Sequence, residues 1–162
     1  MTEGYEPAEV YLGLRGQALA LTRDLLDPET AADGPVLALL METGYPEAVA
    51  TLVGLADGTT SMYFSNGGGM IGAGQHPQVA ATTKRWLELA EQSLDHLPEA
   101  TGDVELPDEG MTQLVAVTES GLRVARASED ELGGGRHPLS PLFYAGHDVI
   151  TAIRVVDEAG EA

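Results

Sequence analysis

A glycine-rich stretch, SNGGGMIGAGQHP at residues 65–77, is the part of this sequence whose residue types come closest to a chemical motif. Gly67, Gly69 and Gly72 within it spell G-x-G-x-x-G, the spacing with which a strand–turn–helix unit presents backbone amides to a dinucleotide pyrophosphate. The context does not fit, because the next helix is expected to start well after the third glycine, near Pro77, and no Lys-Ser/Thr pair follows the glycines. We therefore expect no nucleotide and no other cofactor.

The same glycines can serve the backbone instead, because glycine accepts positive φ and lets another chain approach closely. Met70 and Ile71 interrupt them with apolar side chains, so the stretch could be an ordinary turn, a flap over an apolar site, or a loop at a subunit interface. Our candidate partner-contact or ligand-contact residues are Gly67, Gly68, Gly69, Met70, Ile71 and His76.

A second loop, GGGRHP at residues 133–138, repeats the combination of three glycines and His-Pro ahead of a helix. If both loops lay at one edge, His76, His137 and the pair His147-Asp148 could together suit zinc. The spacing does not enforce that meeting, since a His before Pro is also simply an extended residue. We predict no metal site, and the absence of cysteine excludes thiolate ligands and cysteine nucleophiles.

Catalytic patterns are missing elsewhere too. Five serines and four histidines occur, but no G-x-S-x-G elbow places a serine for activation by a histidine. The densest acidic run, residues 129–131, indicates a solvated loop because calcium loops need alternating oxygen ligands at fixed positions. The sequence therefore predicts no catalytic residue, and a protein that is not an enzyme.

The charge balance limits the partners. The chain has 26 acidic and 8 basic residues, a net charge of −18, which repels nucleic acid phosphates and anionic lipid surfaces. We expect no nucleic acid partner and no membrane partner. The acidity serves solubility or attracts a basic protein.

Length and segment character point to one domain over residues 1–162, since 162 residues with 43% apolar content can bury one ordinary core. No apolar run approaches the roughly 20 residues of a membrane span. The first ten residues carry three glutamates and no cationic region, unlike a signal peptide. We expect a cytoplasmic protein.

Hydrophobic periodicity predicts the elements. Helical spacing covers 7–26, a stripe beginning at Pro77, and a stripe beginning at Ser140. Strand-like runs begin at Val36, Ala48 and Thr59, with Asp57-Gly58 as a two-residue hairpin turn, and two more flank the turn at 119–121. The predicted fold is α+β with two layers, in which three helices cover a five-stranded, largely antiparallel sheet in the order α-β-β-β-α-β-β-α.

This order of elements, with the TESGLRVARAS hairpin at 118–128 before the last helix, resembles the type III secretion chaperone-like fold. The resemblance implies a small, acidic, non-enzymatic homodimer that holds partly unfolded protein segments. A profilin-like or roadblock arrangement would instead place two strands before the middle helix and three after it. We therefore expect a protein-binding module with a chaperone-like or adaptor role and a basic or partly unfolded partner. The alternative is a ligand-binding protein or enzyme with its site at 66–77.

Overall fold

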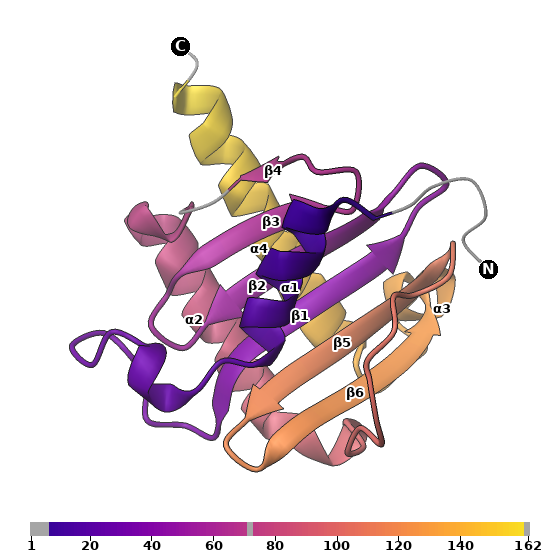
Figure 1. Ribbon diagram of the computed structural model, residues 1–162, viewed down its shortest axis with the longest axis horizontal. Helices are drawn as coiled ribbons and strands as arrows, with labels where there is room; N and C mark the ends of the chain where they lie inside the picture. The colour runs from indigo at the N-terminus through magenta and orange to yellow at the C-terminus, as the bar shows by residue number, and fades with distance from the viewer. Residues whose placement is uncertain (1–6, 71–72, 161–162) are drawn as a thin grey trace.

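One antiparallel sheet organises the chain, and its strand order is β4-β3-β2-β1-β5-β6. The computed structural model describes residues 7–70 and 73–160 (Figure 1). The long strands are β1 (Val36–Gly44), β2 (Val49–Leu55), β3 (Thr60–Phe64), β5 (Met111–Thr118) and β6 (Gly121–Ser128), and the two-residue β4 (Gly69–Met70) is added beyond β3. β1 lies between β2 and β5 and is buried throughout, as its uninterrupted apolar run predicts.

The helices follow the order expected from the sequence. They are α1 (Glu9–Leu19), α2 (Pro77–Gln92), the short α3 (Glu129–Gly133) and α4 (Ser140–Gly160), with 3-10 turns η1 (Arg23–Leu25), η2 (Ala73–Gln75) and η3 (Leu94–His96). Three long strands precede α2, and the other two, β5 and β6, lie between α2 and α3 in the chain. The predicted α+β class and five long strands are confirmed, and the strand count is not that of the profilin-like order.

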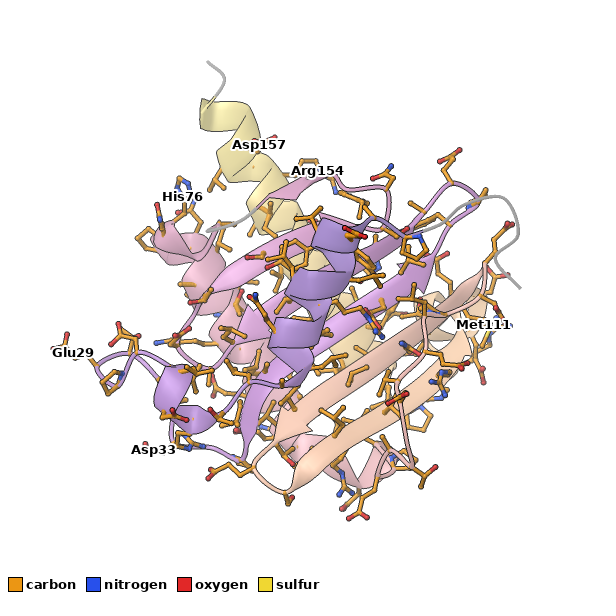
Figure 2. All side chains as sticks on the ribbon, in the orientation of Figure 1. Glu29, Asp33, His76, Met111, Arg154 and Asp157 are labelled. Atoms are coloured by element: carbon orange, nitrogen blue, oxygen red, sulfur yellow. The ribbon has the colours of Figure 1, made fainter. Side chains whose placement is uncertain are left out.

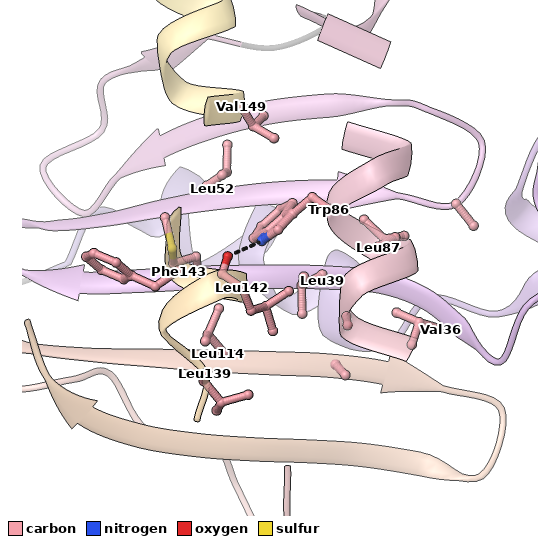
Figure 3. Packing of buried hydrophobic residues seen from close by; sticks show 14 of the residues in the cluster. Val36, Leu39, Leu52, Trp86, Leu87, Leu114, Leu139, Leu142, Phe143 and Val149 are labelled. Carbon is pink, nitrogen blue, oxygen red and sulfur yellow. Dashed lines mark hydrogen bonds between the residues drawn. The ribbon is translucent and has the colours of Figure 1, made fainter. Parts of the chain in front are cut away.

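The main core lies between the sheet and the antiparallel helices α2 and α4 (Figures 1 and 3). Leu39 and Met41 of β1 point to this face, and Trp86 of α2 is fully buried among them. The indole Nε1 of Trp86 donates to the carbonyl of Leu142 at 3.1 Å, which satisfies its one polar group and joins the two helices. Gly146 lets α4 approach closely, because a Cβ there would lie 2.8 Å from the Met41 sulfur.

A second, smaller core lies on the opposite face. Ala38 and Leu40 of β1 point to this side and pack with Val53, Val115 and other apolar side chains. α1 and the segment 98–110 cover it, as Figure 1 shows in front of the sheet. The two layers expected from the sequence are thus supplemented by a partial third.

α1 is shorter than the predicted helix over 7–26. It ends at Leu19, and η1 follows after a break, so the apolar residues beyond Leu21 do not continue one helical face. Gly13 and Gly16 lie on its exposed side, where a Cβ would have no neighbour within 4 Å. These glycines lower helix propensity without allowing any close approach.

Two turns differ from their predictions. At Asp57-Gly58 only Gly58 has positive φ, 92°, and the amide of Leu55 bonds to the carbonyl of Thr59, so the hairpin loop has three residues instead of two. The acidic run at 129–131 forms α3 rather than a loop, because the Ser128 hydroxyl caps it by accepting from the amide of Glu131 at 3.1 Å. None of the described helices has the length and apolar character to cross a membrane.

Candidate functional site

Glu42 of β1 is a buried carboxylate beneath α1, and it is the centre of a network of hydrogen bonds. Its side chain is fully buried, and it accepts two hydrogen bonds from the Arg15 guanidinium, at 2.6 Å and 2.9 Å. The Thr51 hydroxyl of β2 donates to it at 2.9 Å, and the Gln113 amide of β5 donates at 2.7 Å. The charge of Glu42 is therefore paired and hydrogen-bonded on several sides, as a buried charge requires.

Further bonds extend this buried cluster across the sheet. Arg15 also donates to the carbonyl of Val104 at 3.0 Å, and Gln113 donates to the carbonyl of Glu105 at 2.7 Å, so the segment 98–110 is tied in. Arg126 of β6 donates to the Gln113 side-chain oxygen at 2.7 Å, and the hydroxyls of Tyr11 and Thr51 lie 2.8 Å apart. One network thus links α1, four strands and a covering segment.

Burial disfavours the charge of Arg15, but its hydrogen bonds and attraction to Glu42, with a smaller contribution from Tyr11, outweigh burial and raise the pKa of Arg15. The Arg15 guanidinium therefore keeps its charge next to Glu42. The arrangement anchors α1 to the sheet and gives no indication of acid–base catalysis. We did not predict this ion pair from the sequence. The acidic residue at the end of the apolar run VLALLME was a signal for a buried charge that needs a partner.

An apolar groove lies beside this anchored helix, between α1 and β3. It consists of two pockets, with cavity volumes of about 100 and 150 Å³, and Leu14 of α1 and Tyr63 of β3 line both. The first also contacts Val10, Tyr11 and Gly67–Gly69, and the second contacts Ala18, Leu21, Val53 and Ser61 among others. Among the residues that the structure describes, no charged side chain lines either pocket.

The groove lies where α1 passes beside β3. The side chains of Tyr11 and Arg15 bond to Thr51 of β2 and Glu42 of β1, and α1 crosses in front of the sheet (Figures 1 and 2). Its first turn is held next to the glycine stretch by the bond from the Ala8 amide to the Ser65 carbonyl, 2.7 Å. This places Leu14 of α1 beside Tyr63 of β3 at both pockets.

The structure brings only part of the predicted contact set together. Gly67, Gly68 and Gly69 line the first pocket. Gly67 and Gly69 have positive φ, 102° and 153°, and a Cβ on Gly69 would lie 2.4 Å from the Met62 carbonyl, so these glycines shape the turn that closes the groove. Met70 pairs with Met62 in β4, and Ile71 lies outside the described residues.

His76 is not at the groove; it is exposed and precedes α2 at its N-cap. His137 lies before α4, and because α2 and α4 run in opposite directions, the two His-Pro junctions are at opposite ends of the helix pair (Figure 1). The ring Nδ1 of His137 accepts from the Leu139 amide at 3.0 Å, a local role. Within 7–70 and 73–160, no three His, Asp or Glu side chains are grouped to hold a metal ion.

His147 of α4 is a separate feature that the sequence had grouped with these histidines. Its Nε2 is buried and has no hydrogen-bond partner within 7–70 and 73–160, and its ring lies 4.5 Å from that of Phe143, centroid to centroid. Burial lowers the pKa of His147, against a smaller opposing effect of Glu129 and Asp148. The neutral imidazole is therefore favoured in the folded protein.

Comparison with known proteins assigns no family. No protein-family model, no curated protein and no solved structure matches this chain.

The ion pair yields a stability prediction. Glu42→Gln leaves the Arg15 charge buried without a counter-charge, and should lower the free energy of unfolding by about 3–5 kcal/mol in urea denaturation. Arg15→Met/Glu42→Gln removes both charges and should be less destabilised than either single variant. Glu119→Gln, which breaks the exposed pair with Arg23, is the control and should cost less than about 1 kcal/mol. Equal costs for Glu42→Gln and Glu119→Gln would contradict an anchoring role.

His147 yields a pH prediction. Its folded pKa lies below its usual value of about 6.5, so the unfolded chain takes up a proton more readily. The neutral ring contributes its full stabilisation above about pH 6.5, the unfolded pKa, and this contribution is lost as the pH falls towards and through the lower folded pKa. Unfolding measured between about pH 7.5 and 5.5 should show the wild type losing more stability than His147→Gln. Parallel pH profiles for the two proteins would show that His147 does not titrate in this way.

Proposed function

We propose that this protein is a small, acidic, non-catalytic protein-binding module with a chaperone-like or adaptor role. Its contact site in this proposal is the groove between α1 and β3. The observation that carries the proposal is an apolar groove without charged lining on a chain of net charge −18. An apolar site with acidic surroundings favours a basic protein segment that has apolar side chains to bury.

One residue of the groove wall is itself an exposed apolar side chain. Val10 lines the first pocket and is 60% exposed. Exposed apolar side chains gathered at one site mark interaction surfaces more often than scattered single residues do. α1 therefore offers a partner the wall of the groove.

Several arginines form bonds within the protein. Arg15 pairs with Glu42, and Arg126 donates to the Gln113 side chain. Arg123 donates to the carbonyl of Leu97, and Arg136 donates to the carbonyl of Asp130. These bonds hold the fold together, and the chain as a whole has a net charge of −18. The resulting field attracts a basic or partly unfolded partner and speeds its encounter at low salt.

A second candidate function is binding of a small apolar ligand. It is favoured by one observation, that the aromatic rings of Tyr11 and Tyr63 line the first pocket together with Gly67–Gly69. A thermal-shift screen separates the two, since a ligand at 100 times its Kd adds about 2.7 kcal/mol to stability.

The groove can be tested with an unfolded basic protein and an unfolded acidic one of similar length, both reduced and alkylated. The basic chain should bind more tightly, and its affinity should fall as salt is raised because the Debye length shortens. Leu14→Asp places a charge between the two pockets and should weaken binding about tenfold or more, a change of 1.4 kcal/mol or greater. Leu12→Asp is the matched control on the outer side of α1. Equal affinities for both variants would exclude the groove as the contact site.

A homodimer is part of the proposal, as the resemblance to secretion chaperones implies. Two copies with a charge of −18 each repel, so dimerisation has to rely on apolar surface and should strengthen with salt. Light scattering coupled to size exclusion should show twice the mass of 17.0 kDa at micromolar concentration. A monomer at low and high salt alike would remove the dimer from the proposal and leave the groove.

A further inference from the structure

We propose that a second copy of this chain docks behind the sheet, between α4 and the edge that β3 and β4 form. A two-fold axis there pairs Arg154 of each copy with Asp157 of the other. This inference rests on the homodimer of the proposed function and names the surface that forms it. Three features support it: an apolar pocket at this edge, two opposite charges on its rim, and the spacing of these charges along one helix.

The pocket lies between α4 and the sheet edge and has a volume of about 330 Å³. Its apolar lining consists of Ile150 and Ile153 of α4 and Met62 and Phe64 of β3, and Gly69 of β4 completes it. Ile153 is buried, whereas the other three apolar side chains are partly exposed. Apolar surface gathered at one place in this way is available to another molecule.

Two opposite charges form the rim of this pocket. Arg154 and Asp157 both line it, and both side chains are exposed. They lie on the part of α4 that projects past β4 (Figures 1 and 2). Among the residues that the structure describes, neither takes part in an ion pair. Their order along the helix, cation before carboxylate, is the less favourable one for pairing within a single helix.

The spacing of these charges suits a second copy. Residues three apart on a helix lie on one face, so both charges can meet the same neighbour. If two α4 helices pack antiparallel about a two-fold axis that passes between these positions, each Arg154 faces Asp157 of the other copy, and both pairs form at once. A basic segment would be repelled by Arg154 and an acidic segment by Asp157. The rim itself has no net charge, although the whole chain has −18.

The position of Asp157 favours a cation from outside. α4 ends at Gly160, so Asp157 lies in its last turn, where the partial negative charge of the free carbonyls disfavours a carboxylate. Arg154 of the other copy would offset this unfavourable interaction. Dimerisation would therefore relieve a local cost that each separate chain has.

A dimer of this kind leaves the groove between α1 and β3 open. α1 lies in front of the sheet and α4 lies behind it (Figure 1). Each dimer would then present two grooves. A long partner chain that reaches both would bind more tightly than a short one, without any new contact in either groove.

The test is the dimer dissociation constant of the full chain, measured by analytical ultracentrifugation at low salt, with circular dichroism to check folding. Arg154→Glu and Asp157→Arg each place like charges opposite one another across the axis, and each should weaken dimerisation about tenfold or more. The difference from the wild type should shrink as salt is raised. Val155→Asp is the control, because Val155 is 53% exposed on α4 and does not line the pocket.

Two rescue measurements complete the test. The double variant Arg154→Glu/Asp157→Arg has the wild-type net charge and restores complementarity in reverse order, so it should dimerise as the wild type does. An equimolar mixture of the two single variants should form heterodimers, since one has an acidic rim and the other a basic rim.

The outcomes separate this inference from the proposed function. A wild-type dimer that Arg154→Glu leaves intact, or that Val155→Asp weakens equally, would overturn the surface and leave the homodimer. Failure of both rescue measurements would also overturn it. A wild type that stays monomeric at every salt concentration would remove the homodimer and this inference together, while binding of unfolded basic protein through Leu14 would still support the groove.

Discussion

The carboxylate of Glu42, buried in the middle strand of the sheet, is the constraint on which this side of the molecule depends. A charge at that position has to be neutralised where water is excluded, and Arg15 supplies the counter-charge from α1. Because Thr51, Gln113 and the carbonyl of Val104 share in the same network, the pair fixes the helix relative to β1, β2 and β5 and draws the segment 98–110 over the sheet. The groove between α1 and β3 is a consequence of where this anchor lies.

The two faces of the sheet are stabilised in different ways. Behind it, α2 and α4 pack apolar side chains densely around Trp86, and Gly146 lets helix and strand approach. In front, a smaller apolar cluster is supplemented by directional bonds from Arg15 and its partners. Apolar burial is non-directional, whereas an ion pair with four acceptor bonds specifies one position. The front face thus combines a modest core with a defined helix position, and leaves apolar surface uncovered.

The sequence was sufficient for the sheet and the long helices, because each depends on local periodicity. The α2 stripe beginning at Pro77 and the hairpin of β5 and β6 illustrate this. It failed where a distant contact decides the outcome: α1 stops at Leu19, and its anchor at Glu42 joins residues 27 positions apart. Of the predicted contact residues, Gly67–Gly69 line a pocket. His76 lies away from the groove, between η2 and the start of α2. Ser128 followed by three acidic residues is a helix-capping pattern in the sequence, but we predicted a loop where α3 forms.

On α1, the residues that hold the helix to the sheet and the residues that line the groove lie largely on separate faces. Arg15 of α1 carries the attachment by pairing with Glu42 of β1, whereas Leu14 and Gln17 of α1 contribute to the groove wall and are at most half-buried. Substitutions on the wall can therefore alter which side chains the groove accepts at little cost in folding free energy. Such a helix is suited to divergence: partner preference can drift among descendants of this chain while its scaffold is preserved.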